Sequence, residues 1–527
     1  MSLDTFDSVL RCRDALNGLD TIKYGGRVEK IQGQMLYCSG PVAQIGEMCR
    51  IFPSKYNPFT RQNGRNVDES GDDGEEDRSF WGAALPGTEF LDTAPEFYGE
   101  VVALERAHCY IMLYDHPSGL RVGDEVIALG HELEVPVSEE LLGRVVDPLV
   151  RPLDKGPSIA AFIKYPVQRE APGVMSRPPI DEQLSIGVRA IDGLLSLGKG
   201  QRVGIFSGSG VGKSTLLGMI ARNTKADVVV IALIGERSRE VREFLERDLG
   251  EEGRARSILV VSTSNSPALS RIRGAYSATA IAEYFRDLGK DVLLLFDSVT
   301  RFATAGREVG LAIGEPPTVR GFPPSVFNSL PLLLERVGRS ERGSITGIYN
   351  VLVEGGDLDE PVSDTIRGIL DGHIILSRQL AERYHYPAID VPASVSRLEQ
   401  KVSVVEFRPV IAHVKRLLAI YRERQDLIEI GAYATGSNPL LDEAIERLPD
   451  LLGFLQQGTD ENTSLEQTLQ MLLDLVGESA PVRREKTGGG TEAGLQNKSG
   501  STTVGRQGEA LGGDDRQRAG LFSGSGL

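Results

Sequence analysis

Cysteine and positive charge are both scarce in this sequence of 527 residues. The four cysteines, Cys12, Cys38, Cys49 and Cys109, contain no C-x-x-C pair, so we expect neither a disulfide framework nor a zinc site, and a reducing compartment fits better. The net charge of −16 opposes a dominant nucleic-acid role, because such a role needs a basic surface.

Long hydrophobic runs are missing as well. Apolar runs such as VVVIALI (228–234) are far shorter than the roughly 20 residues of a membrane helix, and they suit buried strands. The first residues carry Asp4 and Asp7 and lack a long apolar core, which is unlike a signal peptide. These features predict a cytoplasmic protein.

Composition divides the chain into six segments. Glycine-separated apolar runs predict a small β-barrel, alternating strands and helices predict an α/β domain, and later amphipathic patterns predict helices. A glycine- and charge-rich end is expected to stay unfolded. The predicted segments are an N-terminal helix (1–20), a barrel (21–135) with an acidic mobile loop (about 54–87), a connector (136–164), an α/β domain (165–395), a helical domain (396–478) and a tail (479–527).

The stretch FSGSGVGKSTLL (206–217) matches the phosphate-loop pattern G-x-x-x-x-G-K-[ST], except that Ser207 stands at the first glycine. An apolar strand (203–206) precedes it and a helical pattern follows. In such a turn the backbone N–H groups of residues 208–215 (Gly208, Ser209, Gly210, Val211, Gly212, Lys213, Ser214, Thr215) converge on phosphate oxygens. A chance Gly/Ser turn is the alternative, and FSGSG recurs near the end (522–526) without Gly-Lys-Ser.

Four side chains complete the expected site. Lys213 supplies a charge for the β- and γ-phosphates, and the Ser214 hydroxyl is the expected Mg²⁺ ligand. Asp297 ends the apolar run VLLLFD, where a carboxylate can hold the Mg²⁺ shell. Glu236 follows the strand 228–234 after one glycine, so it is the candidate general base for water. Taken alone, Asp297 would more often be the polar turn after a buried strand, and the charged residues that follow Glu236 indicate only a solvated helix start.

Together these stretches resemble the flagellar and type III secretion export ATPases, relatives of the rotary ATP synthase catalytic subunit. The resemblance spans about 21–475 and includes GERSREVREF (235–244), DSVTRFATAGREVGLAIGEPPTVRGFPPSVF (297–327) and YPAIDVPASVSR (386–397). It implies an α/β fold: a RecA-like P-loop ATPase core between an N-terminal β-barrel and a C-terminal helical domain.

The resemblance also implies roles that the residues alone do not show. Arg397 corresponds to an arginine finger that acts on a neighbouring subunit's γ-phosphate, Tyr386 to an aromatic that stacks on adenine, and Arg301 to an arginine near the γ-phosphate. The implied cofactors are ATP/ADP and Mg²⁺. The implied partners are the other subunits of a homohexamer, a stator-like regulator, export gate components, export chaperones and substrates, at the inner face of the plasma membrane, and no nucleic acid.

Flagellar export is the favoured function, and an injectisome ATPase is the main alternative. A rotary synthase catalytic-type subunit is less favoured. A hexameric RNA translocase uses the same core, but it needs a basic RNA-binding domain where this chain has an acidic loop. A non-catalytic ring subunit is the remaining rival, and it would lack the base expected at Glu236.

Overall fold

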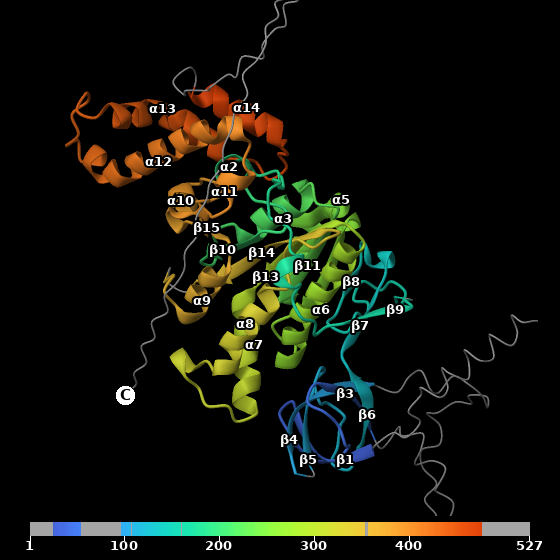
Figure 1. Cartoon of the computed structure of the whole chain (residues 1–527). Helices are drawn as coiled ribbons and strands as arrows, with labels where there is room; N and C mark the ends of the chain where they lie inside the picture. Colours follow the sequence, from blue (N-terminus) through green and yellow to red (C-terminus); the bar gives the residue numbers. More distant parts are fainter. Residues whose placement is uncertain (1–24, 54–95, 107, 160, 354–356, 477–527) are drawn as a thin grey trace, which may run out of the picture. The chain divides into compact units, whose positions relative to one another are not determined.

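The structure is a computed structural model that describes residues 25–53, 96–106, 108–159, 161–353 and 357–476 (Figure 1). The predicted N-terminal helix, acidic loop and C-terminal tail all lie outside these residues. Within them, no helix combines the length and the apolar character that crossing a membrane requires.

The first described part is a closed, six-stranded antiparallel barrel with the strand order β1-β2-β5-β4-β3-β6. Its strands alternate buried and exposed side chains, because one face of each points into the barrel. The buried residues include Cys38, Cys49 and Cys109, all free thiols. The strands are β1 (Gly25–Gln32), β2 (Met35–Ser39), β3 (Glu47–Phe52), β4 (Phe97–Glu105), β5 (His108–Leu113) and β6 (Glu125–Glu132). The predicted N-terminal β-barrel is confirmed.

The segment after the barrel contains more structure than a connector. Strands β7 (Glu134–Val137) and β9 (Ile163–Pro166) pair antiparallel. Strand β8 (Val145–Val146) pairs with β12 (Ser257–Ser262) at one edge of an eight-stranded sheet. Two-residue strands such as β8 have no periodicity of their own, so the sequence could not reveal this one.

The core of the α/β domain is an eight-stranded sheet. Its strand order is β16-β15-β10-β14-β13-β11-β12-β8. Neighbouring strands run parallel, except that β15 and β16 pair antiparallel. The remaining strands are β10 (Arg202–Ser207), β11 (Val228–Ile234), β12 (Ser257–Ser262), β13 (Asp291–Asp297), β14 (Ser344–Leu352), β15 (Gly372–Leu376) and β16 (Val395–Ser396). In parallel sheets, ligands bind beyond the carboxyl ends of the strands.

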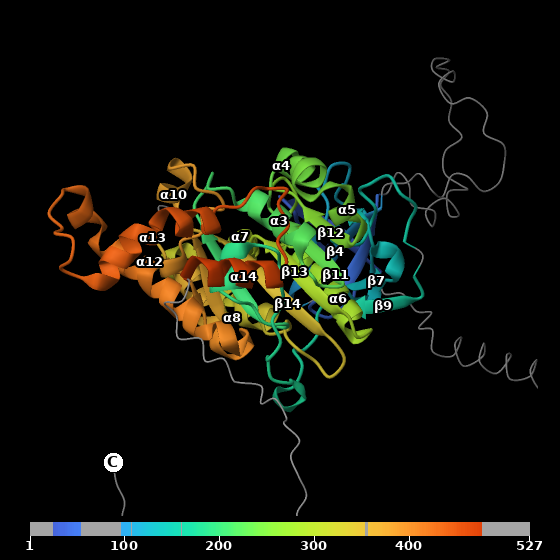
Figure 2. The same ribbon diagram turned by 90° about the horizontal axis from the view of Figure 1, so that it is seen from above.

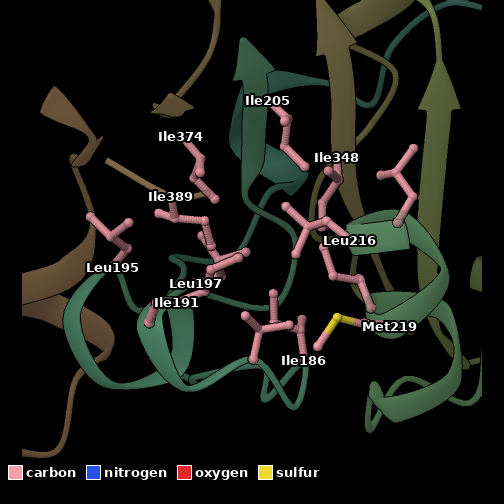
Figure 3. Packing of buried hydrophobic residues seen from close by; sticks show 14 of the residues in the cluster. Ile186, Ile191, Leu195, Leu197, Ile205, Leu216, Met219, Ile348, Ile374 and Ile389 are labelled. Atoms are coloured by element: carbon pink, nitrogen blue, oxygen red, sulfur yellow. The ribbon is translucent and has the colours of Figure 1, made fainter. Parts of the chain in front are cut away.

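Helices cover both faces of this sheet, which is why its central strands are apolar throughout. In β11, Val229, Ile231 and Leu233 join the core under α2 (Arg189–Leu194) and α3 (Lys213–Asn223). Val230 and Ile234 point to the other face and join the core under α6 (Ala268–Asp287) and α7 (Val299–Ala312). Figure 3 shows the first of these cores, where Ile186 and Ile191 from the α2 region lie with Ile205, Leu216 and Ile348 from β10, α3 and β14.

The helices of the core are mostly short. They are α2 (Arg189–Leu194), α3 (Lys213–Asn223), α4 (Ser238–Glu243), a π-helix (Phe244–Leu249), α5 (Gly250–Ala255), α6 (Ala268–Asp287), α7 (Val299–Ala312), α8 (Pro324–Leu334), α9 (Pro361–Ile369), α10 (Arg378–Glu382) and α11 (Glu399–Val402).

The C-terminal part consists of three amphipathic helices, α12 (Arg408–Glu429), α13 (Pro439–Leu455) and α14 (Leu465–Val476) (Figure 2). They pack on one another and on α2 through Val414, Leu417, Phe454 and Leu472. The predicted α/β core followed by a helical C-terminal region is therefore confirmed.

Candidate functional site

The phosphate loop connects the carboxyl end of β10 to the first residue of α3, as the sequence predicts. Gly210 and Gly212 have φ angles of 78° and 84°, which a side chain would strain. Ser207 is the last residue of β10, is buried and keeps a negative φ, so the departure from the glycine pattern costs no backbone strain. The Val211 side chain is buried in the core, so only its backbone can face a phosphate.

Lys213, Glu236 and Asp297 come together at this end of the sheet. The Lys213 Nζ lies 2.9 Å from Asp297 Oδ1 and 3.6 Å from Glu236 Oε1. The strand register is the cause. Leu233 in β11 pairs with Asp297, the last residue of β13, and Glu236 follows β11 by two residues, so both carboxylates lie at the ends of neighbouring strands. Burial works to lower the pKa of Lys213, but the two carboxylates outweigh it and raise that pKa.

Asn350 is a member of this cluster that the sequence analysis missed. It is completely buried in β14, and its Nδ2 donates to Asp297 Oδ1 at 2.5 Å. Phe296 pairs with Tyr349, which places Asn350 beside Asp297 on the neighbouring strand. The available signal was one amide within the apolar run SITGIYNVLV (344–353).

Glu236 has an unusual environment for a carboxylate. Burial, followed by the negative charge of Asp297, raises its pKa to about 7, and Lys213 only partly opposes this. Among the described residues its Oε1 has no hydrogen-bond partner. Within this part of the chain its Oε1 has only the 3.6 Å ion pair with Lys213, and a carboxyl group in this state with a pKa near neutrality is suited to accept a proton from water.

A cavity of about 380 Å³ joins the predicted residues. Arg301 lines it beside Gly235. Gly235 has a φ of 78°, and a Cβ built on it would lie 2.8 Å from the Arg301 Cβ, so there is no room for a side chain at this position. The cavity is lined by Gly208, Ser209, Gly210, Gly212, Lys213, Ser214, Thr215, Glu236, Arg237, Glu240, Arg247, Arg301 and Leu352.

Tyr386 lies next to the loop and not in this cavity's lining. A Cβ built on Gly212 would be 3.2 Å from the Tyr386 ring, and the tyrosine is 41% exposed. The ring is thus near the loop, while the side chain stays partly accessible to a ligand. A planar, partly exposed aromatic ring offers a stacking surface.

Arg397 is not brought to the phosphate loop of its own chain. It is exposed, its Nη2 donates to the Arg367 carbonyl at 3.4 Å, and it lines a separate cavity of about 330 Å³ with Glu399, Lys401 and Lys415. The two cavities share no lining residue.

Two family models match the chain. The ATP synthase alpha/beta family, nucleotide-binding domain, matches residues 187–396, which include Lys213, Glu236 and Asp297. The C-terminal domain of the T3SS EscN ATPase matches residues 406–474, which contain α12, α13 and all of α14 except its last two residues.

Whole-chain relatives agree with these matches. The chain is 47% identical to the "Flagellum-specific ATP synthase" of Treponema pallidum (89% of this chain, 97% of that protein) and 45% identical to that of Bacillus subtilis (88% and 98%). It is 50% identical to a "Type 3 secretion system ATPase" of Xanthomonas euvesicatoria over 71% of this chain and 84% of the relative.

Among solved structures, the assembled ATPase EscN from the enteropathogenic E. coli type III secretion system superposes with a TM-score of 0.74 at 41% identity. That match covers 86% of this chain and 100% of the other. Barrel, nucleotide-binding core and C-terminal helices are therefore all accounted for by one family. The chain belongs to the flagellum-specific and type III secretion export ATPases of the ATP synthase alpha/beta family, and it is an ATP-binding ATPase.

Proposed function

We propose that this ATPase hydrolyses ATP with Mg²⁺ and that Glu236 is the general base. The observation that carries the proposal is the position of Glu236: its partly unpaired carboxyl group lies 3.6 Å from Lys213 in the cavity of the phosphate loop. From there Glu236 takes a proton from the attacking water. Lys213 and the loop amides bind the phosphates, and Arg301 offsets charge on the transferred phosphoryl group.

Ser214 and Asp297 are the proposed Mg²⁺ ligands. The residues fit this ion, because Asp297 is a buried carboxylate beside Lys213 and both proposed ligands offer oxygen atoms. Within the described residues there is no cluster of three or more His, Cys, Asp or Glu for a metal, which suits an ion that keeps waters and phosphate oxygens as ligands. When bound, Mg²⁺ neutralises phosphate charge.

The proposed active unit is a homohexameric ring in which Arg397 completes the site of a neighbour. One support is that the cavity lined by Arg397 shares no lining residue with the phosphate-loop cavity of its own chain. A second is the relative EscN, whose solved structure is of the assembled ATPase. EscN has also been solved in complex with its central stalk EscO. A stator-like regulator, export gate components, export chaperones and substrates are the further proposed partners, at the cytoplasmic face of the membrane.

Flagellar export is the proposed pathway. Three flagellum-specific relatives, from Treponema pallidum, Bacillus subtilis and Borreliella burgdorferi, are each matched over 97–98% of their length. Three type 3 secretion relatives are matched over 84–92% of their length, and two further flagellum-specific relatives over 84–85%, so the preference rests on the first three matches. Restored swimming of a bacterium that lacks its own flagellum-specific ATPase would support this pathway, whereas restored injectisome secretion alone would support the alternative.

The variant Glu236→Gln tests the catalytic assignment. It keeps the shape of the side chain but cannot accept the proton, so turnover should fall by about 10²- to 10⁴-fold while ATP binding persists. The control is Glu243→Gln, which removes an exposed carboxylate of α4 that pairs with Arg239 one turn earlier on the same helix. Full hydrolysis by Glu236→Gln would instead point to a different base.

A further inference from the structure

The segment between α13 and α14 is held by one buried glutamine. Gln457 is 6% exposed, and its side chain makes three hydrogen bonds. Its Oε1 accepts from the Arg189 backbone N–H at 2.8 Å, and its Nε2 donates to the carbonyls of Gly187 at 2.8 Å and Glu461 at 2.9 Å. The amide therefore fixes its own backbone against the entrance of α2.

The same residue reaches the nucleotide site through its backbone. The Gln457 N–H donates to the Tyr386 carbonyl at 3.0 Å, and the Tyr386 ring lies against Gly212 of the phosphate loop. A short chain of contacts thus runs from α2 through Gln457 to the proposed stacking surface for the base.

The neighbouring residues attach the segment to the other side of the site. Arg222, on the helix that begins at Lys213, donates to the Thr459 carbonyl at 2.5 Å. Arg189 is buried, donates to the Phe454 carbonyl at 3.0 Å and pairs with Glu461. The segment that links α13 and α14 is therefore bonded to Tyr386, to α2 and to the last turn of α3, the helix that follows the phosphate loop.

We propose that Gln457 is a positioning residue for the nucleotide base. By locking its backbone to Gly187 and Arg189, it sets the height of Tyr386 over Gly212. It also ties that ring to α13 and α14. The inference rests on the proposed stacking of adenine on Tyr386. It adds that the segment between α13 and α14 determines how well the stacking surface is formed, because this segment carries the residue that holds it.

The test is Gln457→Met, which keeps the length and loses all three side-chain hydrogen bonds. The full chain is titrated with ATP and with inorganic tripolyphosphate, which occupies the phosphate loop but has no base. We expect ATP to bind about tenfold more weakly and tripolyphosphate to bind unchanged, because the loss falls on base contacts. Gln456→Met is the matched control, since the adjacent glutamine is exposed and uses only its carbonyl for Arg189.

Tyr386→Ala separates the two claims. If Tyr386→Ala leaves ATP affinity unchanged, the proposed stacking is wrong. If Tyr386→Ala weakens ATP binding but Gln457→Met does not, only the role of Gln457 is wrong. In the double variant, Gln457→Met should add no further loss, since the ring it positions is gone.

A purely structural role makes a different prediction. If Gln457 were only structural, Gln457→Met would weaken the binding of ATP and of tripolyphosphate equally. Its effect on ATP affinity would also add to that of Tyr386→Ala in the double variant. Either result would overturn the proposal. Should Gln457→Met fold poorly, Gln457→Glu keeps the acceptor for the Arg189 N–H and loses the two donated bonds. That variant should show the same selective loss of ATP binding, and equal loss of both ligands would again contradict the inference.

Discussion

Glu236 shows how the neighbours of one side chain set its chemistry. An exposed glutamate has a pKa near 4.5 and is therefore already ionised at neutral pH. Burial and the charge of Asp297 raise the pKa of Glu236 to about 7. A general base works only in its ionised form, and its efficiency is greatest when its pKa is near the working pH.

We therefore predict that kcat/KM rises with pH through about 7, since this parameter reports the free enzyme. Below that pH Glu236 holds a proton and cannot accept another, so activity falls. The measurement is ATP hydrolysis at subsaturating ATP from pH 5 to 9. Residual hydrolysis by Glu236→Gln serves as the control and should lack this limb. Activity that is already level from pH 5 upward, as for a glutamate with the ordinary pKa of 4.5, would contradict the environment described.

The sequence could identify Lys213, Glu236 and Asp297 as a cluster because each lies at the end of a strand or within six residues after it. Asn350 escaped because its meeting with Asp297 depends on β14 lying beside β13, a pairing of segments about fifty residues apart. Tyr386 and Arg397 were reached only through family resemblance. Their surroundings are formed by long-range packing that local patterns do not encode.

At the scale of elements, strands buried on both faces were the most predictable. The apolar run 228–234 is β11 itself, whereas β15 and β16 were not predicted. Short edge strands take their identity from the neighbour they pair with. In contrast, the glycines within helices could not be interpreted from sequence, because their neighbours come from other elements.

Two helical glycines make opposite predictions. A Cβ at Gly218 in α3 would lie 2.6 Å from the Asp248 carbonyl oxygen, so Gly218→Ala forces α3 away from the π-helix and should cost about 1–3 kcal/mol of stability. Gly453 in α13 has no atom within 4 Å of its Cβ position, so Gly453→Ala should stabilise by about 0.5–1 kcal/mol. Denaturant unfolding of both variants measures the difference. Equal effects would show that α3 can move away from the π-helix at little cost.

For the whole molecule, the separation of Lys213 and Arg397 is the informative feature. Both belong to one chain, yet they line different cavities, so a complete site in the proposed ring draws on two subunits. Hydrolysis then depends on assembly, because a finger supplied by a neighbour stabilises the transition state only when that neighbour is present.

Mixing two inactive variants tests this sharing directly. Lys213→Ala lacks the phosphate-binding charge and Arg397→Ala lacks the finger, so each alone should lose most turnover. In rings reassembled from equal amounts, a site works when an Arg397→Ala subunit provides the loop and a Lys213→Ala neighbour provides the finger, which holds at about a quarter of the interfaces. ATPase activity should therefore reappear on mixing, and only under conditions in which the rings exchange subunits. Variants mixed without exchange are the control. If activity stays absent after exchange, both residues must act within one chain, because a site built in cis is defective in every subunit of the mixture.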